Sequence, residues 1–182
     1  MDKVFVFLAD GFEDVEAVTP IDYLRRVGVN LVTVGVPKKT VNSAHALSIV
    51  CDKTIDEVIN EVPKMAIFPG GLSNTRTLSE SEAVKTISLK TNEKGLIAGI
   101  CAAPAIVFSP WGLLDGKKFT CYPGMDAELP NKAEKTKRVV VDGNLITSAG
   151  PGSAEEFAFK LVELLAGKKA LTNLKKELVA RA

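Results

Sequence analysis

The stretch GLIAGICAAP, residues 95–104, decides the fold, because it joins an apolar run to a turn of small residues around one cysteine. Residues 95–100 are apolar almost throughout, which is typical of a strand buried on both faces of a parallel sheet. Cys101 follows at once, and Gly99, Ala102 and Ala103 are small enough to allow a sharp turn there. A similar turn exposes the serine of G-x-S-x-G hydrolases.

Two interpretations of Cys101 stay open on these residues. A helix expected over residues 102–114 would direct its N-terminal N–H groups at the sulfur and favour the reactive thiolate. The other interpretation is a structural thiol, because free cysteines are among the most buried residue types. The local sequence gives the two similar weight.

Outward from this stretch, short apolar runs alternate with amphipathic segments. Strands are expected at residues 4–10, 30–36, 48–52, 65–71, 95–101 and 118–122. Helices are expected at residues 13–28, 54–59, 79–92, 102–114, 153–165 and 170–179, with Gly167 between the last two. Pro20 predicts a kink or a restart within the first helix. The dipeptide Asp142-Gly143 predicts a late β-hairpin over residues 138–148.

This alternation predicts an α/β fold in which a mostly parallel sheet lies between layers of helices. The late hairpin adds antiparallel strands to that sheet. No internal repeat and no long linker divides the 182 residues. We therefore expect a single domain over residues 1–182.

The composition is that of an ordinary globular chain, with 46% hydrophobic residues, 25% charged residues and a formal net charge of +1. So small a charge predicts no general attraction to nucleic acid or to anionic membranes. The basic segment 132–138 is interrupted by Glu134 and Thr136 and is expected to be a solvated surface. No apolar run is long enough for a signal-peptide core or a membrane span.

The cysteines and the single histidine limit the chemistry further. Three cysteines without a CxxC pair indicate a reducing compartment, for which we expect the cytoplasm. Cys51 and Cys121 lie on or beside apolar strands and are expected to be inert. His45 alone leaves few ligands for a Cys/His zinc site, so no metal is expected. Its polar surroundings make a surface position the default.

In open α/β sheets, ligands bind beyond the carboxyl ends of the strands. Three predicted strands end near Glu16, near the pair Gly70-Gly71 and at Cys101, so these residues converge if the strands are neighbours. Gly70 and Gly71 would then offer N–H donors as an oxyanion hole. The alternatives are a plain turn for the glycines and, for Glu16, a solvated carboxylate in the first turn of a helix.

Four segments in this order resemble the ThiJ/PfpI superfamily, and most closely its deglycase and glyoxalase III-like branch. The resemblance covers nearly the whole chain. LADGFEDVEAVTPIDYLRRVG is similar to the first strand, loop and helix, with Glu16 at the family's carboxylate position, and FPGG is similar to the oxyanion loop. AGICAAPAIV is similar to the nucleophile turn, with Cys101 as the reactive cysteine, and VVVDGNLITSAGPGSAEEFA is similar to the late hairpin and the helix after it.

The resemblance implies a flavodoxin-like three-layer sandwich and a homodimer formed through the 14–27 helix. It implies a Cys101 thiolate of low pKa beside a protonated Glu16 that donates a hydrogen bond to the sulfur, or to a sulfinate after oxidation.

Three positions bear on the family pattern. Ala102 stands where the protease-like branch has a histidine, so peptidase activity is not expected. Tyr122 stands where many deglycase-branch members have a histidine, and a phenol with a pKa of about 10 is a poor proton shuttle at neutral pH. His45 matches a loop position that in family members approaches the pocket of the partner subunit, which implies a pocket or interface residue.

The resemblance implies a cofactor-independent enzyme that converts small α-oxoaldehydes such as methylglyoxal to 2-hydroxy acids and acts on early glycation adducts. Cys101 and Glu16 would be catalytic, and the N–H groups of Gly71 and Ala102 would stabilise the oxyanion. A second interpretation is a redox sensor or stress-protective chaperone that uses an oxidisable Cys101. A thiamine-pathway role rests on the historical family label alone, because no phosphate-binding loop is present.

Overall fold

Strand β1 (Val4–Leu8) shows how the sequence builds the two cores of the molecule. Val4, Val6 and Leu8 join one buried cluster, while Phe5 and Phe7 join another. Successive side chains of a strand point to opposite faces, so a continuous apolar run is what a sheet covered on both sides requires. The computed structural model, which describes residues 3–180, has apolar layers on both faces of this strand.

The described residues form a seven-stranded sheet in the order β5-β2-β1-β6-β7-β9-β8. All neighbours pair in parallel except β8 and β9, the late hairpin. The strands other than β1 are β2 (Leu31–Gly35), β5 (Lys53–Thr54), β6 (Met65–Phe68), β7 (Leu96–Ile100), β8 (Val139–Asp142) and β9 (Leu145–Ser148). Strands β3 (Thr40–Asn42) and β4 (Ser48–Val50) form a separate antiparallel pair. The predicted flavodoxin-like, mostly parallel α/β fold is confirmed.

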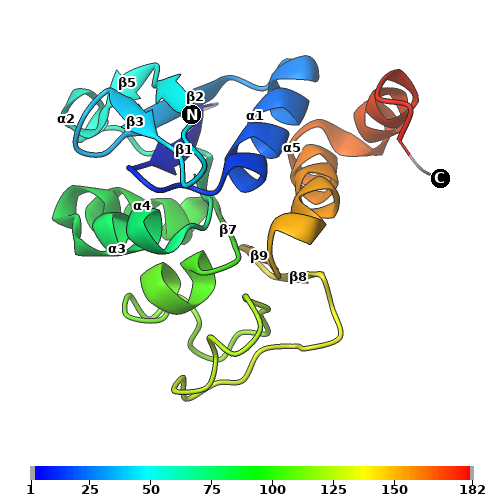
Figure 1. Cartoon of the computed structure of the whole chain (residues 1–182). Helices are drawn as coiled ribbons and strands as arrows, with labels where there is room; N and C mark the ends of the chain where they lie inside the picture. The colour runs from blue at the N-terminus through cyan, green and yellow to red at the C-terminus, as the bar shows by residue number, and fades with distance from the viewer. Residues whose placement is uncertain (1–2, 181–182) are drawn as a thin grey trace.

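Helices cover both faces of the sheet (Figure 1). On one side, α1 (Asp14–Arg26) packs against α5 (Ala154–Glu177). The other side carries α2 (Ile55–Val58), α3 (Leu72–Glu80), α4 (Glu82–Lys94) and the π-helical segment η1 (Pro104–Phe108). A short 3-10 segment, η2 (Pro151–Ser153), leads into α5. No helix of the described residues is long and apolar enough to cross a bilayer.

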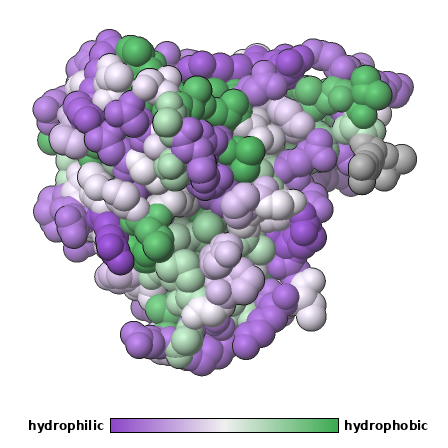
Figure 2. All heavy atoms as spheres, in the orientation of Figure 1, coloured by the Kyte–Doolittle hydropathy of each residue, from purple (hydrophilic) through white to green (hydrophobic). Residues whose placement is uncertain are grey.

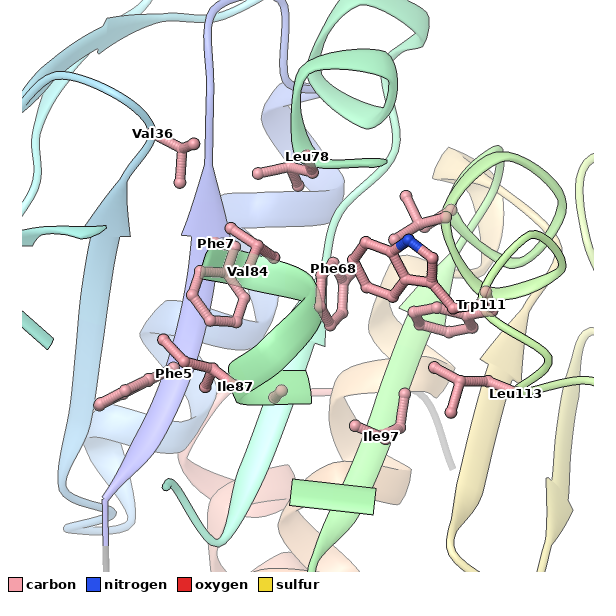
Figure 3. Close-up of a cluster of buried hydrophobic side chains, with 14 of the residues drawn as sticks. Phe5, Phe7, Val36, Phe68, Leu78, Val84, Ile87, Ile97, Trp111 and Leu113 are labelled. Atoms are coloured by element: carbon pink, nitrogen blue, oxygen red, sulfur yellow. The ribbon is translucent and has the colours of Figure 1, made fainter. Parts of the chain in front are cut away.

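The core under α3, α4 and η1 is rich in aromatic side chains (Figure 3). Phe68 lies at its centre, with ring centroids 5.3 Å from Phe7 and 5.2 Å from Phe108. Edge-to-face and tilted pairs at these distances add to the stabilisation from burial. This packing fixes the end of β6, and with it the loop that carries Gly70 and Gly71.

Four elements differ from the sequence predictions. The helix expected over residues 79–92 is two helices, α3 and α4, which meet at Ser81, whose side chain accepts the N–H of Val84. The strand expected at 118–122 is wrong, because no strand occurs between η1 and β8. The helix expected over 102–114 shrinks to η1 and a series of turns. The strand expected at 48–52 belongs to the separate β3–β4 pair.

Other predictions are confirmed with small shifts. Helix α1 is one helix that contains Pro20, without the predicted restart. The hairpin is present, but its two-residue loop is Gly143-Asn144, because Asp142 pairs with Leu145. Gly167, at φ 85°, divides α5 into the two helical parts that the sequence predicts. Helix α2 begins after Thr54, whose N–H donates to Glu57 at 2.8 Å as the capping-box spacing predicts.

Candidate active site

Cys101 lies on a strained turn at the carboxyl end of β7. Its φ is 62°, in the left-handed region that residues with a side chain rarely adopt. Two backbone hydrogen bonds fix this conformation: the Cys101 N–H donates to Ser148 at 2.9 Å, and the Cys101 carbonyl accepts the Tyr122 N–H at 2.9 Å. A strained residue persists where its surroundings over-determine it, as they do here, and such strain is typical of functional sites.

Glu16 enters the same site from the first turn of α1, and its side chain is fully buried. Oε2 accepts the N–H of Gly70 at 2.7 Å, and it lies beside Cys101, since a Cβ atom on Gly70 would touch both Glu16 Oε2 and the Cys101 side chain. Among the described residues, Oε1 has no hydrogen-bond partner. A buried carboxyl oxygen without a partner costs free energy, so this one is a place where a ligand or a proton can be stabilised.

Gly70 has to lack a side chain for this pair to form. A Cβ atom at this position would overlap Glu16 Oε2 and would lie 2.7 Å from the Cβ and 3.1 Å from the Sγ of Cys101. The Gly70 N–H is bound to Glu16, so the prediction that Gly70 offers a free oxyanion donor is wrong. Its amide instead holds the carboxyl group.

The other predicted oxyanion donors are the N–H groups of Gly71 and Ala102, and both amides act to lower the pKa of the Cys101 thiol. Gly71 has φ 90°, and a Cβ there would overlap the backbone carbonyl of Gly11. The close approach of two loops therefore requires glycine at this position. These two amides face the place where negative charge develops when the sulfur attacks a carbonyl.

The pKa values of both Glu16 and Cys101 are raised from their ordinary values. Burial raises the pKa of Glu16 to about 7, although the Gly70 amide and Cys101 act in the opposite direction. Burial and the charge of an ionised Glu16 raise the pKa of Cys101 to about 12, against the Ala102 and Gly71 amides. The low thiol pKa implied by the family resemblance is thus not what this geometry gives. The helix expected to lower it is only the short η1.

The two groups titrate as a coupled pair, which above about pH 7 has lost its first proton and holds the remaining one on oxygen or on sulfur. When that proton lies on Glu16, the repulsion between carboxylate and thiolate disappears and the carboxyl group can donate a hydrogen bond to the sulfur. This is the protonation state in which the Cys101 sulfur is a thiolate.

A cavity of about 800 Å³ opens onto Cys101. Ala102, Gly71, Tyr122 and His45, which are predicted to contact a substrate, line it. The rest of its wall is mainly apolar: Gly11, Ala44, Leu72, Pro123, Met125 and Pro151, with Glu13 and Ser73. Figure 2 shows a group of pale green residues in the lower centre of the face, bordered by hydrophilic residues.

His45 lies at the rim of this cavity and is paired with the start of α1. Its Nδ1 lies 2.9 Å from Asp14 and 3.9 Å from Glu13, and this contact with Asp14 and the nearby charge of Glu13 raise the pKa of His45. The ligand atoms of these three residues lie within 4.8 Å of one another, which makes them the described group most able to hold a metal ion. The His45–Asp14 ion pair accounts for their arrangement.

Asn74 is a site residue that sequence reasoning missed. Fully buried in α3, it accepts the Ala9 N–H at 2.7 Å and donates to the carbonyls of Pro69 at 2.9 Å and Gly70 at 3.1 Å. It thereby ties the ends of β1 and β6 together and fixes the loop that holds Glu16. A polar residue two positions into an unpredicted helix carries no local signal for this role.

The fold and the site define a class: α/β proteins with a cysteine on a strained turn at the carboxyl edge of the sheet, beside a buried carboxyl group. The chain belongs to the DJ-1/PfpI family, whose model matches residues 2–164.

Individual relatives agree with this assignment. Protein DJ-1 homolog B of Arabidopsis thaliana is 38% identical over 98% of this chain, which spans 42% of that protein's length. A protein of Pyrococcus horikoshii named a deglycase is 32% identical over 90% of this chain and 99% of its own. The structure of oxidized Toxoplasma gondii DJ-1 superimposes with a TM-score of 0.93 at 36% identity, covering all of both chains.

Proposed function

We propose that the protein is a cysteine-dependent enzyme that converts small α-oxoaldehydes to 2-hydroxy acids without a cofactor and acts on early glycation adducts by the same chemistry. The observation that carries this proposal is the contact between a fully buried Glu16 and Cys101 at the floor of an open cavity. The relative named a deglycase supports it.

The reaction begins when the Cys101 thiolate adds to the aldehyde carbon of methylglyoxal and forms a C–S bond. The N–H groups of Gly71 and Ala102 stabilise the oxyanion, and Glu16 gives it a proton, which yields a hemithioacetal. The Glu16 carboxylate then removes the proton from the former aldehyde carbon and returns it to the neighbouring carbon, while the hydroxyl proton of the hemithioacetal moves to the former ketone oxygen, which gives a thioester of lactate. Water hydrolyses the resulting thioester to lactate and the free thiol, so that the net reaction adds one water molecule.

Lactate formation from methylglyoxal by the purified protein, in the absence of glutathione, tests this proposal. The expected pH profile of kcat/KM rises through about pH 7, because the pair has to lose one of its two protons before sulfur can attack. Absence of lactate under these conditions would refute the enzymatic proposal.

A redox sensor is the second candidate, and one observation favours it. Glu16 has an unpartnered buried oxygen, Oε1, and the Gly71 and Ala102 amides act on the Cys101 sulfur, so the site offers groups able to hold sulfinate oxygens. The neighbouring Toxoplasma gondii structure is described as oxidized. To test the sensor, the protein is treated with peroxide and analysed by mass spectrometry. If the protein makes no lactate and Cys101 alone carries two added oxygens, the result favours the sensor.

We further propose that the protein is a homodimer that uses α1. Val15 and Val18 on this helix are 45% and 41% exposed, although both are apolar. Burial of such side chains against a second copy is favourable. Light scattering at micromolar concentration should give a particle mass of twice the chain mass. In Val18→Lys the particle mass should fall to that of a single chain.

A further inference from the structure

One wall of the Cys101 cavity is built from a segment that has no regular secondary structure. Residues 109–138, between η1 and β8, contain neither strand nor helix and consist of turns. Within them Tyr122, Pro123 and Met125 line the cavity. Irregular segments of this length in a folded domain are usually functional or mobile. Residues 122–133 are here called the wall loop. The contacts that hold this loop in place therefore determine the shape of the cavity.

The wall loop separates two cavities. Behind it lies a second cavity of about 240 Å³, lined by Cys121, Asp126 and Ala133 among others. Tyr122 and Pro123 line both cavities. At these two residues the wall therefore faces open space on both sides.

Successive turns shape the wall loop and leave carbonyl groups at its end. The N–H groups of Met125, Ala127 and Leu129 each donate to the carbonyl three residues earlier, at 3.1–3.2 Å. The Asp126 carbonyl accepts the Leu129 N–H, whereas the carbonyls of Ala127 and Leu129 accept no backbone N–H among the described residues, as is usual for the last carbonyls of a helical turn. Lysine near a helical C-terminus is a known way to satisfy such groups.

Lys132 satisfies the carbonyls of Ala127 and Leu129 and adds a second donor to that of Asp126. Its Nζ donates to the carbonyls of Asp126 at 3.1 Å, Ala127 at 2.9 Å and Leu129 at 2.8 Å. All three ammonium protons are therefore used on one short stretch of backbone. Hydrogen bonds from a charged donor are about twice as strong as those between neutral groups.

A side-chain hydrogen bond next to Lys132 fixes the end of the wall loop. The buried carboxylate of Asp126 accepts the Ala133 N–H at 3.1 Å, so the residue after Lys132 is fixed to the same turn. Met125, Leu129 and Ala133 pack against the aromatic core and anchor the loop there. Lys132 is the cationic link in this small network.

We propose that Lys132 is a positioning residue, which fixes the wall loop between the Cys101 cavity and the cavity that contains Cys121. It contacts neither Cys101 nor Glu16 and acts through Tyr122, Pro123 and Met125. The part of this inference that concerns catalysis rests on the proposed function, whereas the part that concerns the wall does not.

Thiol labelling tests the wall without any assay of activity. Cys121 is 4% exposed and lies behind the loop, and Cys51 is 1% exposed in the core on the other face of the sheet. In Lys132→Met, alkylation of Cys121 should be at least about tenfold faster than in the parent, because the loop opens more often. Labelling of Cys51, read by mass spectrometry in the same sample, should not change, which excludes global unfolding.

Two variants serve as controls. Lys132→Arg keeps a cationic donor and should label at Cys121 within about threefold of the parent, and Lys90→Met on α4 should behave as the parent. Where Lys132→Met cannot be isolated folded, Lys132→Gln provides the same comparison. An unchanged Cys121 rate in a folded neutral variant would overturn the proposal, and so would equal acceleration in Lys132→Arg.

The kinetic test depends on the proposed function. With methylglyoxal as the substrate, Lys132→Met should raise KM about three- to tenfold and leave kcat within about twofold, because the wall is displaced while the Cys101–Glu16 pair is intact. A fall in kcat at constant KM would overturn the positioning role. If the parent itself makes no lactate, the proposed function fails, and the labelling result still decides whether Lys132 holds the wall.

Discussion

Cys101 and Cys51 are the same chemical group in two different regions of the molecule. Burial raises the pKa of both thiols, to about 12 for Cys101 and about 11 for Cys51. Cys51 lies closed within the core beneath α1 and α5, whereas Cys101 is half-buried, on a left-handed turn that faces a cavity. Because the two pKa values are similar, the thiol pKa does not distinguish the two cysteines. What distinguishes Cys101 is access to a cavity, two nearby backbone amides and a carboxyl group with which it shares a proton.

The largest expected effect follows from removal of the sulfur. Cys101→Ser should reduce methylglyoxal turnover by about 10³-fold or more, because no other group in the cavity replaces the thiolate as nucleophile. The matched variant Cys51→Ala should keep turnover within about twofold. Comparable losses in the two variants would remove the distinction between the two regions.

Glu16→Gln should have the next largest effect. The amide can still occupy the pocket beside Gly70 but cannot shuttle a proton, so turnover should fall by about 10²-fold or more, the usual scale of general acid–base catalysis. Alkylation of Cys101 should persist, and the rise of kcat/KM near pH 7 should disappear. Turnover at the parent rate would mean that Glu16 is not the acid–base partner.

The raised pKa of Glu16 also predicts a pH dependence of stability. The folded protein holds this proton up to about pH 7, whereas the unfolded chain loses it near 4.5. The contribution of this proton to the free energy of unfolding is therefore fully present below pH 4.5. This contribution, about 3 kcal/mol, is lost as the pH rises through 7.

Urea unfolding at several pH values should show this loss in the parent and not in Glu16→Gln, which cannot ionise. The difference between the two proteins then belongs to this one group. Parallel pH profiles would show that Glu16 ionises in the folded state as easily as in the unfolded chain.

The smallest effect concerns selectivity among the thiols. One equivalent of iodoacetamide near neutral pH should label Cys101 about tenfold or more ahead of Cys51 and Cys121, because only Cys101 borders the large cavity. Peptide mapping by mass spectrometry gives the order directly. If Cys121 were labelled first in the parent, the wall loop would already be open in the native state.

Much of the fold could be predicted because apolar periodicity is a local signal. The continuous apolar runs of β1, β6 and β7 require burial on both faces, and the pattern of residues 138–148 requires a hairpin. Because ligands bind beyond the carboxyl ends of the strands in such sheets, Glu16 and Cys101 are expected in one crevice. The family resemblance then distinguishes these two residues from their neighbours. Residues 118–122 show the limit of such signals, because an apolar stretch was expected to be a strand and is irregular.

What the sequence by itself determined is which faces must be buried, since side-chain spacing along one segment carries that information. What only the tertiary structure decided is which backbone groups meet across the chain. The Gly70 amide reaches Glu16 across 54 positions, Asn74 reaches Ala9 across 65, and Ser148 fixes the strained turn of Cys101 from another strand. Every residue except proline carries the same backbone donor and acceptor, so no sequence pattern distinguishes the amide that will bind a distant carboxyl group. The chemistry of the site depends on those long-range pairings.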